Sequence, residues 1–344
     1  MKSLIYGYGK TGESFERYLN KKNLKFDIFD KNIKKYSKKY DLTKYDQILC
    51  SPGIPKDIYH DILCKNKNVL TDLDLFFRED NSIKIGITGT NRKSTTAYHL
   101  YQLFKDFDSV NLIGNIGNPM LDSINSSKYS ILELSSFQLD KMITNNLDFG
   151  ILLNIDVDHL DYHGDFESYK EAKEKILLSK KFLKSEIDPC KLFKWITKTD
   201  AKEIIFKNLP YRYQIISEKV INDSKCTNFH ALKYAIKKTN KKFFDSEYIL
   251  IVCGDPKKEG NREIEICGPE EIYIFGKHSK QIDKCIKHSN KKIFETLEEI
   301  FKSLNSQKIC KNILFSPGYP SGEDFANFEE RGDVFNKIFK KYSI

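Results

Sequence analysis

Polar residues with the spacing of a nucleotide-binding loop occur near residue 90. The segment Gly86-Ile-Thr-Gly-Thr-Asn-Arg-Lys-Ser-Thr95 follows an apolar run and opens a helix-like stretch. Backbone N–H groups at a helix start, together with an ammonium and a hydroxyl, can hold ATP phosphates and complete the coordination of Mg²⁺. An anion-binding turn that does not handle ATP is the alternative. The candidate ATP-binding residues here are Gly89, Thr90, Asn91, Arg92, Lys93, Ser94 and Thr95.

Arg92 stands where nucleotide loops normally have a glycine, directly before the lysine. Glycine is used there because the chain often needs a positive φ angle or a close backbone approach. An arginine must either find an allowed conformation or cost about 1 to 3 kcal/mol of strain.

Acidic and basic residues follow two further apolar runs. Glu133 ends the run that begins at Ser130, and residues 154–163, with two histidines and three acids, follow the run that begins at Phe149. Ligands gather at the carboxyl ends of parallel strands, and a carboxylate there suits a hard cation. Taken alone, His159 could be a structural histidine, and Lys173, on the helical stretch beyond, could be a solvated lysine.

A glycine-rich turn opens the chain. The segment Gly7-Tyr-Gly-Lys-Thr-Gly12 lies between a predicted strand and a predicted helix, and Asp30 ends the next strand. Glycines in that context let the backbone approach a diphosphate, and the acidic residue can accept a hydrogen bond from a ribose or base. A turn without a ligand and a nicotinamide dehydrogenase site are the alternatives.

Three polar turns near the C-terminus also follow predicted strands or precede a helix. Residues 222–228 are rich in helix-capping side chains, residues 254–258 follow an apolar strand, and residues 316–332 follow the last strand. Each could be only a surface turn, but all three lie where an open parallel sheet builds its sites.

The elements that must position these residues alternate short apolar strands with helix-like stretches, which is the rhythm of βαβ units and a parallel α/β sheet. Three such blocks begin near residues 4, 83 and 210. Residues 182–208 are rich in lysine and predict only one or two helices or short strands. The predicted strands are residues 4–6, 26–29, 47–50, 83–88, 130–134, 149–154, 248–253, 271–275 and 312–315, and the predicted helices are residues 14–22, 95–104 and 229–238.

Length and composition indicate a globular protein of two or three domains, because the chain has 344 residues. Hydrophobic residues at 40% and charged residues at 31% exclude collagen-like, low-complexity and wholly disordered proteins. The 57 basic and 48 acidic residues give a net charge of +9, spread along the chain. This distribution suits anionic small substrates and predicts no nucleic-acid partner. No apolar stretch reaches the roughly 18 to 20 residues of a transmembrane helix.

The cysteines contain no C-x-x-C pair and no spacing that suits zinc. We expect reduced, mostly buried thiols in a cytoplasmic protein, since the N-terminus also lacks the pattern of a secretion signal. The 8 cysteines are Cys50, Cys64, Cys190, Cys226, Cys253, Cys267, Cys285 and Cys310.

Together these motifs resemble the Mur ligases, the amide-forming enzymes of peptidoglycan synthesis. Gly-Thr-Asn-Arg-Lys-Ser-Thr at residues 89–95 is similar to the family's phosphate loop. Glu-Leu-Ser-Ser-Phe-Gln-Leu at residues 133–139 resembles the segment of the D-glutamate-adding members, as do residues 222–228 and the closing motif up to Gly332. The matches keep the family's order from Gly7 to Gly332.

The resemblance implies a three-domain α/β fold. Residues 1–81 would form a Rossmann-like domain for the UDP-sugar, residues 82–208 a shortened central P-loop-type ATPase domain, and residues 209–344 a Rossmann-like domain for ATP and the amino acid. The implied reaction joins D-glutamate to UDP-N-acetylmuramoyl-L-alanine with ATP and Mg²⁺, through an acyl phosphate. We expect a cytoplasmic monomer whose partners are these small molecules.

The resemblance also implies roles by position. The implied catalytic residues are Lys93, Glu133, His159 and Lys173. The implied Mg²⁺ ligands are Ser94, Glu133, His159 and, once carbamylated, Lys173. The implied UDP-sugar contacts are Gly9, Thr11, Gly12, Asp30 and Asn115, the further ATP contacts are Arg212 and Asp223, and the D-glutamate contacts are Lys225, Thr227, Lys257, Ser321 and Phe328.

Two features depart from the family pattern. One is Arg92. The other is length: only 38 residues separate Lys173 from Arg212, where the family has a longer stretch with more strands and an H-N-x-x-N-type segment that helps to bind ATP. The loss of strands could expose a sheet edge, which proteins usually cover or charge. The lysine-rich replacement could do this with Lys180, Lys181, Lys184, Lys191, Lys194 and Lys198.

A non-catalytic protein that binds UDP-sugar or nucleotide and acts as an interaction partner is therefore the alternative to an active ligase. The dehydrogenase alternative is weaker because it leaves every motif after Asp30 without a role.

Overall fold

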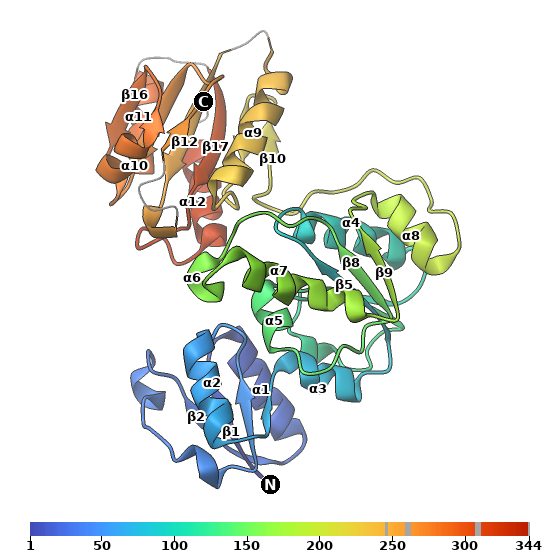
Figure 1. The fold of residues 1–344 in the computed structure, drawn as a ribbon. Helices are drawn as coiled ribbons and strands as arrows, with labels where there is room; N and C mark the ends of the chain where they lie inside the picture. The colour runs from blue at the N-terminus through green and yellow to red at the C-terminus, as the bar shows by residue number, and fades with distance from the viewer. Residues whose placement is uncertain (245–246, 259–262, 307–310, 343–344) are drawn as a thin grey trace. The chain divides into compact units, whose positions relative to one another are not determined.

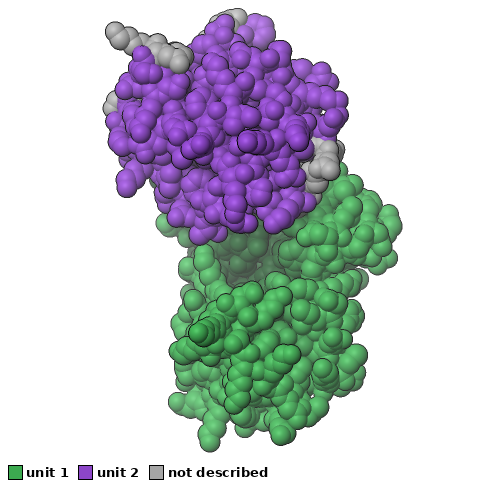
Figure 2. Space-filling model, turned by 90° about the vertical axis from the view of Figure 1, so that its left-hand side faces the viewer, with its two compact units in different colours: residues 1–207 green, residues 208–344 purple. Residues whose placement is uncertain are grey.

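The computed structural model describes residues 1–344 except 245–246, 259–262, 307–310 and 343–344. Contacts divide the chain into two compact units, Met1–Lys207 and Asn208–Ile344, which are coloured separately in Figure 2. The first unit contains two separate parallel sheets (Figure 1). The division into three domains at residues 81/82 and 208/209 stays a prediction.

The first sheet is parallel, with strand order β2-β1-β3-β4. Its predicted strands are confirmed, but the first helix begins at Lys10, directly after Gly9, and not at Ser14. The pattern of apolar residues does not reveal the first turn, because Lys10, Thr11 and Glu13 are polar and Gly12 has no side chain. The elements are β1 (Lys2–Tyr6), α1 (Lys10–Lys21), β2 (Lys25–Phe29), β3 (Gln47–Cys50), α2 (Lys56–Lys65), β4 (Val69–Leu70) and α3 (Asp72–Glu79).

The second sheet of this unit is also parallel, with order β6-β7-β5-β8-β9. Strand β5 lies at its centre and runs directly into the predicted phosphate loop. The elements are β5 (Ile83–Thr88), α4 (Lys93–Lys105), β6 (Val110–Gly114), β7 (Tyr129–Glu133), α5 (Ser136–Lys141), β8 (Phe149–Leu152), α6 (Leu160–His163), α7 (Phe166–Glu174), β9 (Lys181–Lys184) and α8 (Pro189–Thr197).

The shortened segment supplies the last strand and helix of this sheet. Strand β9 has the sequence Lys-Phe-Leu-Lys and pairs with β8 at the sheet edge. Helix α8 buries Leu192, Phe193 and Ile196 in the core that also holds α4. The short replacement therefore both closes the sheet with a charged edge strand and covers part of one face.

One hydrophobic core joins the two sheets of the first unit. It contains Ile5 and Phe15 from the first sheet and α1, Phe76 from α3, and Leu132 and Leu139 from β7 and α5. Helix α3 begins with a capping box in which Thr71 and Asp74 exchange hydrogen bonds. This packing makes residues 1–207 one compact unit.

The second unit is built on a six-stranded sheet of order β10-β11-β17-β12-β14-β16, with β13 and β15 as a separate parallel pair. All neighbours in the larger sheet are parallel except β10 and β11. The elements are β10 (Gln214–Ser217), β11 (Val220–Asn222), α9 (Phe229–Lys242), β12 (Tyr248–Cys253), β13 (Ile264–Glu265), β14 (Glu271–Phe275), α10 (Ser279–Cys285), β15 (Ile286–Lys287), β16 (Lys291–Phe294), α11 (Leu297–Ser306), β17 (Asn312–Gly318) and α12 (Phe328–Tyr342).

The α/β class and the parallel sheets are confirmed. Among the described cysteines, Cys50, Cys226, Cys253 and Cys285 are buried, whereas Cys64, Cys190 and Cys267 are exposed, and all are free thiols. Cys310 lies outside the described residues. Within the described ranges, no helix has the length and apolar character needed to span a bilayer.

Candidate active site

The predicted phosphate loop connects β5 to α4 at the carboxyl edge of the second sheet. Gly89 packs so closely that a Cβ atom there would lie 3.1 Å from Leu153 Cβ and 3.2 Å from the Asn154 carbonyl. Arg92 adopts φ 66° and ψ 1°, which is the left-handed conformation that glycine normally occupies. The arginine therefore keeps the backbone shape of the loop at the expense of local strain.

The loop is held by the segment that follows β8. Thr90 N–H donates to the Asn154 carbonyl at 2.9 Å, and Asn91 N–H donates to Asn154 Oδ1 at 2.8 Å. Asn154 returns a hydrogen bond from Nδ2 to the Asn91 carbonyl, and Asp156 N–H donates to Thr90 Oγ1 at 2.8 Å. Asn154 was not among the predicted site residues, although its place at the end of a strand is a signal that could have identified it.

Two lysines converge on one carbonyl of this loop. Lys93 Nζ donates to the Gly89 carbonyl at 2.8 Å and to the Thr90 carbonyl at 3.0 Å. Lys173 Nζ, from α7, donates to the same Gly89 carbonyl at 2.8 Å. The sequence separates the two lysines by 80 positions, and the fold brings them to one oxygen atom.

Lys173 is buried, with 1% of its surface exposed. Its ammonium lies 4.9 Å from the centre of the Tyr169 ring. Burial, and then the nearby charge of Lys93, holds the pKa of Lys173 well below the ordinary lysine value, and Asp158 and Glu133 oppose the shift only in part. Lys173 is therefore not a solvated lysine but a buried amine that loses its proton more readily than an exposed lysine does.

Glu133 is also buried, at 1% exposure, at the end of β7. Its Oε1 accepts a hydrogen bond from Asn115 Nδ2 at 2.9 Å. Its Oε2 is buried and has no hydrogen-bond partner in the part of the chain that the structure describes. A buried carboxylate oxygen without a donor is costly unless another group satisfies it.

His159 is the N-cap residue directly before α6, in a left-handed conformation with φ 53°. Its ring lies 4.8 Å from the Phe137 ring and 6.4 Å from the Tyr169 ring, measured between centres, and its Nε2 is 3.7 Å from Asp158 Oδ2. One third of the side chain is exposed, so the imidazole is accessible to a ligand.

The donor set fits Mg²⁺ held between protein and phosphate. The described residues contain no group of three or more His, Cys, Asp and Glu side chains that could hold a metal by themselves. Mg²⁺ in nucleotide sites keeps several waters and uses one or two carboxylates together with substrate phosphates. The unsatisfied Oε2 of Glu133 supplies such a carboxylate, and Ser94, in the first turn of α4, lies buried beside the phosphate loop.

The first sheet holds the other predicted loop. Gly12 packs against the Gly7 carbonyl so that a Cβ atom would lie 2.4 Å from that oxygen, whereas Gly9 has open space around it. Thr11 follows in the first turn of α1. Asp30 accepts hydrogen bonds from the Tyr8 and Asn32 backbone N–H groups at 2.8 Å each. Asp30 therefore shapes the loop, and a contact between Asp30 and a ligand stays a prediction.

In the second unit, Asp223 and Lys225 follow β11. Asp223 accepts from the Tyr213 N–H at 2.8 Å and from Ser316 Oγ at 2.9 Å, and burial raises its pKa to about 6. Lys225 Nζ lies 3.8 Å from the centre of the Phe328 ring. The structure thus brings two of the predicted D-glutamate residues, Lys225 and Phe328, together.

The remaining predicted residues of this unit lie on its loops. Ser321 is buried after β17, and Thr227 is half-buried just before α9. Lys257 is exposed, with its ammonium 3.6 Å from Asp255 Oδ2, and Arg212 is half-buried near β10. The convergence of these four residues on one ligand stays a prediction.

Arg331 was not predicted as a site residue, and it organises the loops of the second unit. It is fully buried on α12. Its guanidinium donates to Ser224 Oγ at 3.1 Å, to the Ser224 carbonyl at 2.7 Å and to the Tyr319 carbonyl at 3.0 Å. A fully buried arginine with three acceptors fixes the loop after β11 against the loop after β17.

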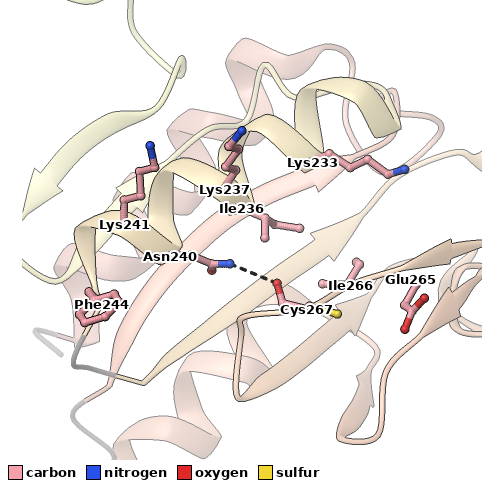
Figure 3. Close-up of a pocket in the computed structure, with 9 residues that line it drawn as sticks. All are labelled: Lys233, Ile236, Lys237, Asn240, Lys241, Phe244, Glu265, Ile266 and Cys267. Carbon is pink, nitrogen blue, oxygen red and sulfur yellow. Dashed lines mark hydrogen bonds between the residues drawn. The ribbon is translucent and has the colours of Figure 1, made fainter.

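A separate open pocket of about 520 Å³ lies on the second unit between α9 and residues 265–267 (Figure 3). Figure 3 shows Ile236 and Ile266 facing each other, and Asn240 Nδ2 donates to the Cys267 carbonyl at 3.3 Å. None of the predicted site residues lines this pocket. Its lining residues are Lys233, Ile236, Lys237, Asn240, Lys241, Phe244, Glu265, Ile266 and Cys267.

Comparison with known sequences finds the Mur ligase middle domain over residues 87–250. The chain is 29% identical over 404 aligned positions to the UDP-N-acetylmuramoylalanine--D-glutamate ligase of Francisella tularensis, covering 98% of this chain and 95% of that protein. It is 28% identical over 412 positions to the protein of the same name from Aquifex aeolicus, with 98% of each chain covered. Since this chain has 344 residues, the first alignment leaves at least 60 positions of the relative without a counterpart here.

Solved structures share the fold at lower identity. The MurF ligase of Thermotoga maritima in complex with ADP gives a TM-score of 0.60 at 15% identity, with 99% of this chain and 94% of that chain covered. The UDP-N-acetylmuramate-alanine ligase MurC of the same organism gives a TM-score of 0.59 at 13% identity, with 99% of each chain covered. These likenesses confirm the fold class.

Proposed function

We propose that this chain is a Mur ligase that forms an amide bond between UDP-N-acetylmuramoyl-L-alanine and D-glutamate and converts ATP to ADP and phosphate. The match to the Mur ligase middle domain and the similarity to D-glutamate ligases over nearly the whole chain support this proposal. The observation that carries this proposal is the convergence of Lys93 and Lys173 on the Gly89 carbonyl. The charge of the buried Glu133 acts on Lys173 as well. The sequence relatives that name the same reaction support the choice of substrates.

The first chemical step transfers the γ-phosphoryl group. An oxygen of the alanyl carboxylate attacks the γ-phosphorus, the bond from that phosphorus to the β,γ-bridging oxygen breaks, and ADP leaves. Such a transfer needs little covalent help from the protein and depends on positioning and positive charge. In this proposal, Lys93 turns from the loop carbonyls to the β- and γ-phosphates, which are better acceptors for its ammonium.

The second step forms the amide. The amine of D-glutamate attacks the acyl carbon and forms a C–N bond, the amine loses a proton, and the bond from carbon to the phosphorylated oxygen breaks to release phosphate. We propose Lys225, Thr227, Lys257, Ser321 and Phe328 as contacts of D-glutamate.

The remaining residues have binding roles in this proposal. Gly9, Thr11, Gly12, Asp30 and Asn115 contact the UDP-sugar. Gly89, Thr90, Asn91, Arg92, Lys93, Ser94, Thr95, Arg212 and Asp223 bind ATP. The backbone geometry at Gly9 and Gly12 supports the first group, because one glycine leaves open space and the other permits the tight turn.

Mg²⁺, when bound, neutralises phosphate charge and orients the γ-phosphoryl group. We propose that Ser94, Glu133 and His159 hold it, because Glu133 has an unsatisfied buried oxygen and His159 remains accessible. Lys173 joins them as a carbamate. Its lowered pKa supports this role, because the uncharged nitrogen can attack CO₂, form an N–C bond and release a proton to leave an anion.

The proposal places the enzyme in the cytoplasm as a monomer that uses small molecules and no nucleic acid. Mass spectrometry of the product after incubation with ATP, Mg²⁺, UDP-N-acetylmuramoyl-L-alanine and D-glutamate tests the reaction directly. We expect a product that contains one added glutamate residue, and a smaller amount with L-glutamate. Calorimetry that detects UDP-sugar binding but neither ATP/Mg²⁺ binding nor product would instead favour the non-catalytic binding protein.

A further inference from the structure

Lys141 is a buried lysine that no step of the proposed reaction uses. It ends α5 and is only 3% exposed. Its ammonium donates to the Pro52 carbonyl at 2.7 Å and to the Tyr162 hydroxyl at 2.6 Å. It also lies 5.4 Å and 4.7 Å from the centres of the Tyr59 and Tyr162 rings. One ammonium group therefore joins three segments that lie far apart in sequence.

The Pro52 contact leads to the glycine-rich loop of the first sheet. Pro52 follows β3, and its neighbour Ser51 donates from Oγ to the Gly7 carbonyl at 2.7 Å. Gly7 is the first residue of the loop proposed to approach the UDP group. A Cβ atom on Gly7 would lie 3.0 Å from Ile54 and 3.1 Å from Ser51, so this loop and the 51–54 segment are in direct contact.

The Tyr162 contact leads to the proposed metal side. Tyr162 lies on α6, and His159 is the N-cap residue of that helix. The Tyr162 hydroxyl donates to Asp140 Oδ2 at 3.3 Å, and Asp140 also lies 3.7 Å from the Lys56 ammonium. Helix α5 itself begins three residues after Glu133. Lys141 thus connects the segments that carry Glu133 and His159 with the segment that supports the glycine-rich loop.

This arrangement costs stability. An ammonium taken out of water is unfavourable unless good acceptors and rings surround it, and an apolar side chain of similar length would fill the same space at a lower cost. Other polar contacts in this unit are more accessible to water, such as the Arg17–Asp122 pair and the Lys56–Asp140 pair. Accessible ion pairs contribute little rigidity. The buried Lys141 contacts are better placed to fix the geometry.

We propose that Lys141 is a positioning residue for phosphoryl transfer: its ammonium fixes the separation between the 51–54 segment and helices α5 and α6, so that the sugar-linked carboxylate meets the γ-phosphate. The proposal rests on the proposed ligase function. An error of about 1 Å in the position of a reacting group can reduce the rate about 100-fold. The hydrogen bonds of the Lys141 ammonium go to Pro52 and Tyr162, which lie outside the ATP loop, so we expect nucleotide binding not to depend on Lys141.

The test compares the full-length parent with Lys141→Met, which keeps the length of the side chain and removes the ammonium. We expect kcat for phosphate release to fall about 100-fold, while KM for ATP stays within about twofold. Tyr162→Phe, which removes one of the two hydrogen bonds, should reduce kcat about tenfold. Lys175→Met is the matched control. The Lys175 ammonium also donates to a partly buried carbonyl, that of Asp140 at 2.6 Å, but this bond ends on α5 and does not involve the 51–54 segment.

Hydrogen exchange separates positioning from loss of the fold. In Lys141→Met we expect faster backbone exchange at residues 51–55, unchanged exchange in β5 and α4, and an intact unfolding transition. The positioning role would be overturned if kcat of Lys141→Met equalled that of the parent. It would also be overturned if this variant lost ATP binding as strongly as it lost kcat, or if kcat of Lys175→Met fell by the same factor. If the parent itself makes no product, the proposed function fails. If the parent makes product and Lys141→Met makes it equally fast, only the positioning role of Lys141 fails.

Discussion

Asn115 holds Glu133 from two sides. The Asn115 side-chain amide donates to Glu133 Oε1 at 2.9 Å, and the Asn115 backbone N–H donates to the Glu133 carbonyl at the same distance. The resemblance to Mur ligases implied a contact between Asn115 and the UDP-sugar. The structure adds a contact with Glu133 that leaves Oε2 without a hydrogen-bond partner among the described residues, and we expect a bound cation to satisfy this oxygen.

Replacement of Asn115 by Ala should weaken the use of Mg²⁺. We expect the Mg²⁺ concentration for half-maximal phosphate release to rise about 10- to 100-fold, which is typical when a partner that orients a metal ligand is lost. A Mg²⁺ titration at saturating substrates measures it. Asn111→Ala is the control, since Asn111 lies at the other end of β6 and its amide bonds to Ser126 Oγ. An unchanged Mg²⁺ dependence with a raised KM for the UDP-sugar would limit Asn115 to substrate contact.

Arg92→Gly should stabilise the protein and preserve or improve ATP turnover. Glycine accepts the φ of 66° without the strain that a Cβ atom causes, and after its own entropy cost we expect a gain of about 0.5 to 1 kcal/mol in unfolding free energy. Urea unfolding and phosphate release measure the two effects. Lys198→Gly is matched to it, because Lys198 has φ 64° at the end of α8 and should gain similar stability without a change in turnover. Complete loss of activity in Arg92→Gly would contradict the strained-loop account.

The stability of the parent relative to Lys141→Met should rise with pH. Burial lowers the pKa of Lys141 to about 8, against 10.5 for an exposed lysine, although Cys50 and Asp140 oppose the shift and Lys56 adds to it. Between these values the unfolded chain binds more protons than the folded one, so raising the pH favours the folded state. From pH 7 to 9.5 we expect the unfolding free energy of the parent, relative to that of Lys141→Met, to rise by about 2 kcal/mol. Urea unfolding of both proteins across this range measures it, and a difference independent of pH would refute the lowered pKa.

The lysines of β9 should prevent edge-to-edge association. Phe182 is 54% exposed between Lys181 and Lys184 on a strand that ends the second sheet. Charged side chains on an exposed edge disfavour pairing with another chain. We expect Lys181→Val combined with Lys184→Val to self-associate at concentrations where the parent scatters no additional light. The control is Lys191→Val combined with Lys194→Val, on α8. If both double variants scattered light to the same extent, the lysines of β9 would have no specific role in preventing association.

Much of the fold was predictable because parallel strands buried on both faces are continuous apolar runs. Strands β3, β5, β12 and β14 begin and end at the predicted residues. The segment after Lys180 was not predictable in the same way. Strand β9 has only four residues, with lysines at both ends, so it has no continuous apolar run. Helix α8 does carry an apolar stripe, formed by Leu192, Phe193 and Ile196, and this spacing is a signal that could have identified it.

The candidate site was predictable as a set of motifs but not as a geometry. Loop composition and strand order identified Lys93 and Glu133. The burial of Lys173 depends on packing between α7 and the phosphate loop, which are about 80 residues apart, and no local pattern reports such a contact. Lys141 carried no sequence signal, because a lysine at the end of a helix is ordinarily solvated and favourable with the helix dipole.

The central claim is that this chain couples ATP hydrolysis to amide formation despite Arg92 and the shortened segment. The most direct test measures phosphate release by the purified protein with Mg²⁺-ATP, UDP-N-acetylmuramoyl-L-alanine and D-glutamate. Each substrate is omitted in turn, and Lys93→Ala is measured alongside the parent. The account predicts phosphate release that requires all three substrates and is abolished in Lys93→Ala. No release by the folded parent, or release that is equal in Lys93→Ala, would contradict it.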